Sequence, residues 1–360
     1  MTAVSVSLLC TLLLAARALH AEPYLAIQQG YKCVQCHVNP TGGGMRNAFG
    51  DTFAQTQIAT SRFDPAAPVW TGVVSQYLSI GGDVRGDLAA THVKGQSTTH
   101  EFDLQEARAY AEATVIPGRL SVYVDERVAP GGASNMEAYL RLFSANAHWN
   151  LQAGQMFLPY GLRLQDDSAF VRQVTGINMT TPDTGVQLGY ESGPWSAQVA
   201  LTNGSAGGAA TGKGSEVTSQ VVYVTGIWRL GVAASFNDAQ AAKRRVQGIF
   251  AGLRTGPIAW LAEADLVVDN GFPEGQRKLA SALLEGDWNV RQGHNVKLTA
   301  EVFDPDRSVA NDAQTRWSAL YEYTPVEFLQ LRGGLRWYEG IPQNDQQNRR
   351  VLFVELHGYF

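Results

Sequence analysis

The last ten residues of the chain read Val351-Leu-Phe-Val-Glu-Leu-His-Gly-Tyr-Phe360. Every second side chain of this stretch is apolar, namely Leu352, Val354, Leu356 and the final Phe360. A period of two residues places alternate side chains on opposite faces of a β-strand. The C-terminal stretch therefore predicts a strand with one apolar face.

The same alternation recurs upstream. Residues 296–302 read Val-Lys-Leu-Thr-Ala-Glu-Val, and residues 107–115 and 329–338 follow the same pattern. In each segment one face is apolar and the other polar, and across the segments the polar faces carry charges of both signs. A water-soluble β-sandwich also alternates in this way, so the pattern by itself leaves two all-β architectures open.

Three further features favour a barrel that crosses a membrane. The segments approach the roughly 9–11 residues that a tilted transmembrane strand needs. Tryptophans stand near segment ends, at positions 149, 260, 288, 317 and 337. Tight connections (191–194 and 255–257) alternate with long polar ones (204–215, 269–277, 304–314 and 340–348). Outer-membrane barrels combine aromatic girdles with short periplasmic turns and longer outer loops.

The final Phe360 adds a fourth feature, because a terminal strand that ends in Phe resembles the signal recognised by the outer-membrane assembly machinery. We therefore predict an all-β fold over residues 69–360. It is a transmembrane antiparallel β-barrel of about 16 strands, porin-like and surrounded by the lipid of a bacterial outer membrane.

The composition agrees with this class. The chain has 360 residues, of which 37 are glycines, and 10% are aromatic, as suits many strands and turns. The net charge is −5, so the chain lacks the excess of basic residues that is typical of nucleic-acid-binding proteins. Residues 1–21 resemble a secretory signal peptide, because the apolar run from Val4 to Ala16 is too short to span a bilayer. Cleavage is expected after Ala21 or after Ala18.

The chemistry of the chain centres on Cys33-Val34-Gln35-Cys36-His37. The C-x-x-C-H spacing is that of a c-type haem attachment site. Two thiols add to the porphyrin vinyl groups, and the adjacent histidine ligates the iron. A zinc site normally needs four ligands, and the mature N-terminal zone offers three. A disulfide is the other alternative in an oxidising compartment, and His37 would then be incidental. We predict one covalent haem c, with Cys33 and Cys36 as anchors and His37 as proximal iron ligand.

The sixth iron ligand has two candidates. Met45 follows the flexible Gly42-Gly43-Gly44, and the alternative for this residue is that it packs on the porphyrin. His357 faces inward if Leu356 faces lipid, and its alternative is a hydrogen-bonded residue of the lumen.

The haem zone, residues 22–68, ends in the linker Asp64-Pro65-Ala66-Ala67-Pro68. The part before the linker, roughly 22–62, has about forty residues, which bury too little surface to enclose a porphyrin alone. We therefore expect residues of the barrel to complete the haem pocket, and the segment to act as a plug in or at the mouth of the barrel.

The stretch from Gly154 to Arg172 is similar to the strand-and-loop passage of phosphate-selective-type porins. It is interpreted either as a constriction loop in the lumen, where Arg163 and Arg172 set the charge, or as an ordinary turn. Inward-facing arginines at 108, 332 and 336 are expected to be balanced by glutamates at 106, 112 and 355.

Taken from end to end, the chain resembles the fused monohaem cytochrome–porins of the outer membrane, a family that includes Fe(II)-oxidising members. The resemblance implies a haem c in a 16-stranded barrel that carries single electrons between an extracellular donor or acceptor and a periplasmic c-type cytochrome or other carrier. Enzymatic activity, such as Fe(II) oxidation, is left open. Three alternatives remain: a solute porin with a structural or regulatory haem plug, a periplasmic haem enzyme with an open sixth site, and one component of a conduit with a separate multihaem cytochrome.

Overall fold

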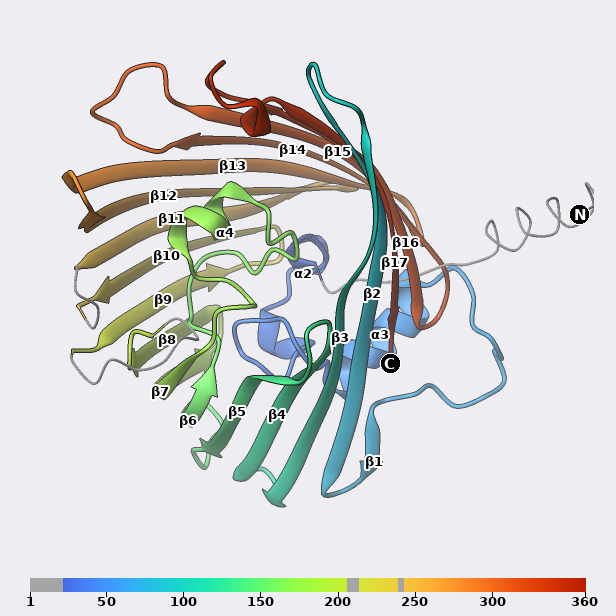
Figure 1. The fold of residues 1–360 in the computed structure, drawn as a ribbon. Coiled ribbons are helices and arrows are strands. Elements are labelled where there is room, and N and C mark those ends of the chain that lie inside the picture. Colours follow the sequence, from blue (N-terminus) through green and yellow to red (C-terminus); the bar gives the residue numbers. More distant parts are fainter. Residues whose placement is uncertain (1–21, 206–213, 239–242) are drawn as a thin grey trace, which may run out of the picture.

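The computed structural model describes residues 22–205, 214–238 and 243–360, which form a closed antiparallel barrel (Figure 1). Each strand from β2 to β17 pairs with the next along the chain, and β17 pairs with β2, so these sixteen strands close the ring. The strands are β1 (Val73–Ser75), β2 (Leu78–Val93), β3 (Thr99–Ile116), β4 (Leu120–Ala129), β5 (Ser134–Phe143), β6 (Trp149–Met156), β7 (Asp183–Ser192), β8 (Trp195–Thr202), β9 (Glu216–Val224), β10 (Trp228–Asn237), β11 (Arg244–Thr255), β12 (Ile258–Phe272), β13 (Gly275–Arg291), β14 (His294–Asp304), β15 (Gln314–Val326), β16 (Leu329–Glu339) and β17 (Arg349–Tyr359).

Helical segments are short. They are α2 (Pro23–Gln29), η1 (Cys33–Gln35), α3 (Ala48–Phe53), η2 (Ala54–Ile58), α4 (Phe170–Thr175) and η3 (Asp345–Gln347). Within the described residues, no helix is long and apolar enough to cross a bilayer. The predicted signal peptide, residues 1–21, lies outside the described residues.

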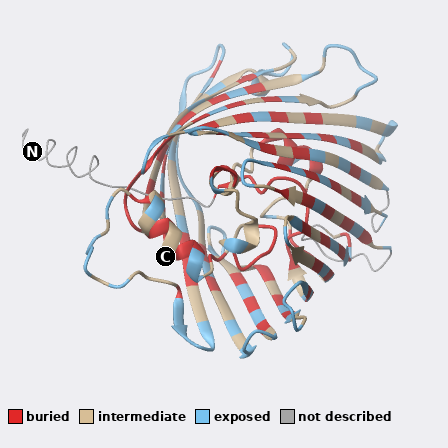
Figure 2. Ribbon diagram, turned by 180° about the vertical axis from the view of Figure 1, so that it is seen from behind, coloured by how far each residue is buried: buried red, intermediate tan, exposed pale blue. Residues whose placement is uncertain are grey.

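The alternation of side chains confirms the barrel and excludes the sandwich. Along β17 the apolar Leu352, Val354 and Leu356 are exposed, whereas Glu355 and His357 are buried. Figure 2 shows the same banding on most strands of the ring. A sandwich buries its apolar faces in a core, but here the apolar face points outward and the polar face inward. That inversion is what a lipid-surrounded barrel requires.

The connections fall into two classes, as predicted. Turns at 117–119, 193–194, 256–257 and 292–293 are tight, and they share the end of the barrel at which β17 finishes. Since short turns face the periplasm in such barrels, we take this end as the periplasmic mouth.

One predicted loop is wrong. Residues 269–277 do not form a long connection, because β12 continues to Phe272 and β13 begins at Gly275. Asp269 still pairs with Arg277 across the two strands. The polar residues there mark strands that extend beyond the apolar band into water, not a reversal of the chain.

Candidate functional site

Residues 22–62, which we call the N-terminal segment, lie against the inner wall of the barrel at the periplasmic mouth (Figure 1). Gln28 donates its side-chain amide to the Pro257 carbonyl at 2.7 Å. Gln292 donates to the Ala59 carbonyl at 2.6 Å, and the Thr60 hydroxyl donates to the Thr324 carbonyl at 2.9 Å. Pro257 and Gln292 belong to tight turns, so the segment is fixed at that end of the barrel.

A single short helical turn carries the C-x-x-C-H motif. The Lys32 backbone N–H donates to the Gln35 side chain at 2.7 Å, which caps η1. The His37 N–H donates to the Cys33 carbonyl at 3.0 Å. This winding brings Cys33, Cys36 and His37 to one cavity, which all three line. Both cysteines are free, so the disulfide alternative is not realised in this structure.

The triple glycine after the motif reverses the chain. Gly42, Gly43 and Gly44 have φ of 91°, 77° and 61°, a region that residues with a Cβ rarely adopt. A Cβ at Gly44 would lie 2.8 Å from the Tyr123 hydroxyl oxygen. The tight loop returns the chain so that Arg46 pairs with His37 in an isolated antiparallel bridge.

The helix that follows packs on the back of the motif. Asn47 caps α3 by accepting the Gly50 N–H at 3.0 Å, and its amide donates to the Val34 carbonyl at 3.2 Å. Tyr31 packs edge-on against Phe53, with 6.0 Å between the ring centroids. Tyr31 and Phe53 both line the cavity and give it an aromatic side.

This cavity, which we call the motif cavity, is open to solvent, and its empty space together with that solvent amounts to about 1030 Å³. The N-terminal segment supplies one side. The opposite side comes from the barrel wall and from residues 161–163, and includes Val222, Val224, Arg229 and Phe250. The barrel therefore completes a pocket that the short segment does not enclose by itself.

Burial sets the protonation states of the motif side chains. Burial, followed by the nearby Arg46 charge, lowers the pKa of His37 to about 4, so the imidazole is neutral at pH 7. Its Nδ1 is buried and has no hydrogen-bond partner among the described residues. Burial raises the pKa of Cys36 to about 11, with a contribution from Cys33, so this thiol stays protonated. Zinc prefers thiolates, and among the described residues no group of three or more His, Cys, Asp or Glu side chains is arranged to hold a metal ion.

Neither candidate for the sixth ligand, Met45 or His357, lines the motif cavity. Met45 is 2% exposed and packs in a cluster with Val38, Tyr110, Tyr123, Tyr139 and Met156. It is not among the residues that line the motif cavity. His357 faces inward, as the alternation predicts, but its Nε2 contacts the Asp83 carboxylate. This is the hydrogen-bonded lumen role given as its alternative.

Arg46 is a site residue that sequence reasoning missed. It is 9% exposed, lines the motif cavity and stacks over the Tyr359 ring with 4.2 Å from its guanidinium carbon to the ring centroid. No ion pair joins it to another described residue. Nothing in the local sequence separates Arg46 from a solvated arginine; its burial results from the glycine reversal before it.

A second cavity lies beside the first. This lumen cavity is open to solvent, spans about 1340 Å³ with that solvent included, and is lined by charged side chains, among them Arg85, Asp167 and Arg336. It shares His37, Gly43 and Arg46 with the motif cavity. The same three residues therefore face both spaces.

The connection between β6 and β7, residues 157–182, folds into the lumen and confirms the constriction-loop interpretation over the ordinary turn. We call it the lumen loop. The Phe170 N–H donates to the Glu301 carboxylate at 2.6 Å, and Asp166 pairs with Arg316 at 3.0 Å. Because Glu301 and Arg316 belong to β14 and β15, the loop reaches the opposite wall (Figure 1).

The predicted role of two loop arginines is wrong. Arg172 pairs with Glu263 of β12, and Arg163 donates to the Thr41 hydroxyl at 2.7 Å. Both are buried as tethers, and neither lines the lumen cavity. The charges that the loop presents there are those of Asp166 and Asp167. Burial, with repulsion from Glu106 and Asp166, raises the pKa of Asp167 to about 6.

The other predicted charge pairs form in part as expected. Arg108 pairs with Glu106 at 2.8 Å, and Arg332 with Glu355 at 2.9 Å. Arg336 instead pairs with Asp166 at 3.1 Å, and Glu112 accepts from Arg141 at 2.7 Å.

The barrel is similar to solved porin structures. An anion-selective porin from Comamonas acidovorans is 12% identical, with a TM-score of 0.62 over 79% of this chain and 99% of that one. A loop-deletion mutant of the outer-membrane protein OmpT of Vibrio cholerae is 11% identical, with a TM-score of 0.60 over 79% and 99%. The outer-membrane channel DcaP of Acinetobacter baumannii is 14% identical, with a TM-score of 0.58 over 79% and 97%.

No protein-family model matches the chain, and no curated protein sequence does either. The likeness concerns the fold: the chain is a porin-like β-barrel. Together with the apolar outer face, this fold confirms the predicted location in the bacterial outer membrane.

Proposed function

We propose that this barrel carries one covalent haem c in the motif cavity and passes single electrons across the outer membrane. An extracellular redox partner, such as Fe(II) or Fe(III), would exchange electrons on one side and a periplasmic carrier on the other. The observation that carries the proposal is the meeting of Cys33, Cys36 and His37 at one cavity, whose remaining wall the barrel supplies.

The residues present fit such a group. Cys33 and Cys36 would form the two thioether bonds, and the neutral, buried imidazole of His37 would ligate the iron. When bound, the haem supplies one-electron redox chemistry at a potential set by its axial ligands and its burial.

The residues around the motif would bind the haem and shield it from water. Val222, Val224 and Phe250 exclude water from the wall opposite the motif. Arg46 is a buried cation whose charge acts on the nearby Asp51 but which forms no ion pair within 4 Å among the described residues, so a further anion beside it would be stabilised. A haem propionate is an anion of suitable chemistry, so Arg46 is the residue we assign to it.

The position within the barrel supports a direction of access. The N-terminal segment lies at the short-turn mouth, where a periplasmic carrier would dock. The lumen cavity adjoins the same His37 and Arg46 from inside the barrel. An extracellular donor small enough to enter the lumen would therefore approach the site from the other side.

Covalent attachment is tested first. We expect the protein from outer membranes of cells with a cytochrome c maturation system to retain haem stain on a denaturing gel. The Cys33→Ala/Cys36→Ala variant should lose the stain while the barrel still assembles. An unstained wild-type band, or a mass without an added porphyrin, would contradict the proposal.

Electron transfer is tested separately in proteoliposomes. Trapped reductant should bleach an external acceptor only in vesicles that contain the haem-loaded protein.

The second candidate is a solute-conducting porin in which the haem is a structural or regulatory plug. The polar lumen cavity and the porin-like fold favour it. Conductance that is independent of the haem redox state, together with no transfer of electrons in the vesicles, would support this alternative instead.

A further inference from the structure

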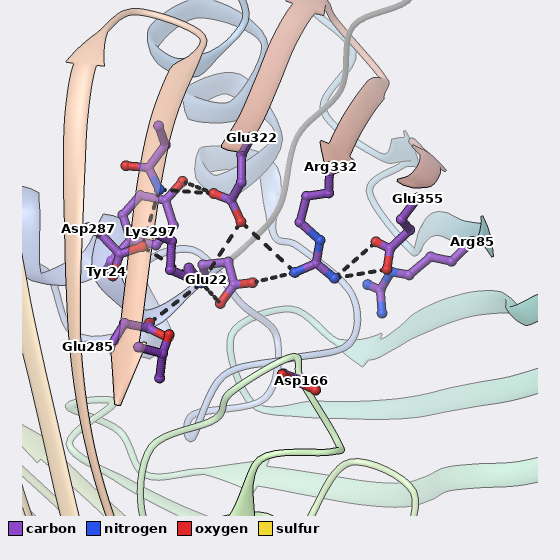
Figure 3. A network of polar contacts seen from close by, with 12 residues as sticks. Glu22, Tyr24, Arg85, Asp166, Glu285, Asp287, Lys297, Glu322, Arg332 and Glu355 are labelled. Carbon is purple, nitrogen blue, oxygen red and sulfur yellow. Dashed lines mark hydrogen bonds and ion pairs between the residues drawn. The ribbon is translucent and has the colours of Figure 1, made fainter. Parts of the chain in front are cut away.

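A buried charge network joins Glu22, the first described residue, to the barrel wall (Figure 3). Glu22 is 4% exposed. One of its carboxylate oxygens lies 3.3 Å from Lys297 Nζ and the other 3.3 Å from Arg332 Nη1. Lys297 Nζ also lies 3.5 Å from Glu285, 3.7 Å from Asp287 and 3.9 Å from Glu322.

Acids outnumber bases in this network. We call its five carboxylates, Glu22, Glu285, Asp287, Glu322 and Glu355, the acidic cluster; among the described residues Lys297 and Arg332 pair with them, and Arg85 lies beside Glu355 (Figure 3). Nearby Arg85 pairs with Asp83 and Glu106. Buried charges are costly unless they are matched, so the cluster calls for a further positive charge.

Unsatisfied acceptors point to the same need. Asn295 donates its amide to Asp287 Oδ1 at 3.2 Å and to Glu322 Oε2 at 3.0 Å. This fixes the orientation of the amide and leaves Asn295 Oδ1 without a hydrogen-bond partner among the described residues. Asp287 Oδ2 likewise has none, although Asp287 is fully buried. A further hydrogen-bond donor that faces both oxygens would satisfy them.

We infer that this donor is the α-ammonium group of the mature chain, created at Glu22. Glu22 directly follows Ala21, the last residue of the predicted signal peptide. A signal peptidase would hydrolyse the Ala21–Glu22 peptide bond with one water molecule, which leaves a carboxylate on Ala21 and an amine, protonated from solvent, on Glu22. One uncharged peptide N–H is thereby replaced by three N–H donors and a positive charge.

The inference selects between the two predicted cleavage positions. Cleavage after Ala18 would place the ammonium group three residues earlier and leave a neutral amide at Glu22. Cleavage after Ala21 places the charge on the residue whose carboxylate already contacts Lys297 and Arg332. Burial, with repulsion from Glu322 and Glu285, raises the pKa of Glu22 to about 7 despite Lys297 and Arg332. An adjacent ammonium would lower that pKa. This inference does not depend on haem attachment.

The experiment has two readouts on the mature protein purified from outer membranes. N-terminal sequencing should begin Glu-Pro-Tyr-Leu, and a chain that begins at Leu19 or elsewhere would overturn the inference. The terminal amine is then labelled at pH 7 with an N-hydroxysuccinimide ester, in the native state and in urea. A free α-amino group has a pKa of about 7.7–8.0, and each unit of increase slows labelling about tenfold. We expect labelling at least about tenfold slower in the native state than in urea. Equal rates would overturn the inference and favour an inorganic cation as the missing charge.

Matched variants separate charge pairing from simple enclosure. Asp287→Asn and Glu322→Gln should each speed native-state labelling. Glu216→Gln serves as the control, because Glu216 is also buried but bonds to Ser235 and Asn237 in another part of the wall. If the cluster variants label no faster than the control, the cluster does not hold the ammonium group. Insertion of Gly-Ser before Glu22 gives a second measurement: it should lower the Tm, and an unchanged Tm would count against the inference.

Discussion

Arg172 holds the lumen loop across the barrel, and its replacement by Leu should release that loop. The guanidinium is 2% exposed, pairs with Glu263 and donates to the Ile177 carbonyl at 3.1 Å. In Arg172→Leu the Glu263 carboxylate stays buried and keeps the Leu162 N–H at 2.7 Å, but loses its cation. Removing one partner of a buried ion pair costs about 3–5 kcal/mol.

We expect this loss of stability to detach the loop and to leave the barrel folded. The barrel is a continuous ladder of backbone hydrogen bonds, whereas the loop is attached by side chains at a few points, among them Asp166 with Arg316 and Phe170 with Glu301. Since about 1.4 kcal/mol is a factor of ten, the open loop should gain roughly 10²–10⁴-fold in population. The result is a detached loop inside an intact barrel.

Two assays measure that population. Proteinase K added to the detergent-extracted barrel should cut between residues 157 and 182 much faster in Arg172→Leu than in the wild type. Planar-bilayer recordings should show more frequent openings to a higher conductance. Arg277→Leu is the control, because the Arg277–Glu274 pair is exposed and such pairs contribute about 0–1 kcal/mol.

The double variant Arg172→Leu/Glu263→Leu decides the physical argument. Removing both charges leaves no uncompensated ion, so cleavage should return close to the wild-type rate. If the double variant is cut as fast as the single one, or the single one as slowly as the wild type, the ion pair does not hold the loop.

Three further predictions concern the two cavities. Asp167, with a pKa raised to about 6, is protonated at pH 5 and ionised at pH 7. The lumen cavity therefore gains a negative charge, and its cation selectivity should rise, between these two pH values. In Asp167→Asn the reversal potential should not change with pH. Arg46→Gln removes a positive charge beside the proposed haem, which favours the oxidised iron, and a redox titration should show a midpoint lower by several tens of mV, since about 1.4 kcal/mol equals 59 mV for one electron; Arg277→Gln should leave it unchanged. Gly44→Ala combines a positive φ with a clash at the Tyr123 hydroxyl and should cost about 1–3 kcal/mol in thermal unfolding, whereas Gly95→Ala, with a similar φ but open surroundings, should cost less.

The barrel could be predicted because its pattern is local. A period of two fixes which side chains share a face, as in 296–302 and 351–360, and an inverted face needs no knowledge of distant partners. The prediction of a long loop at 269–277 was wrong because it also used local composition alone. Polar composition reports contact with water, and strands that leave the bilayer meet water before they turn.

The site was predictable only where spacing defines chemistry. The spacing of Cys33, Cys36 and His37 sufficed to bring them together, because one helical turn sets their geometry. The environment of Met45 could not be predicted, because the residue packs in an apolar cluster with Tyr123 and Tyr139 of the distant barrel strands.

The role predicted for the loop arginines, Arg163 and Arg172, was wrong for a similar reason. Their partners, Thr41 and Glu263, lie about a hundred residues away from them along the chain. Such pairings depend on the closed ring, which no local pattern encodes.

The seam between β2 and β17 determines how the N-terminal segment can be reached. Phe360, the last residue, exchanges backbone hydrogen bonds with Gly82 at 3.0 and 3.1 Å, and this pairing shuts the wall around the N-terminal segment. A segment that lies early in the chain is thus surrounded by a ring that β17 closes. Proteins that act on this segment after closure therefore have to approach it through the mouth of the barrel.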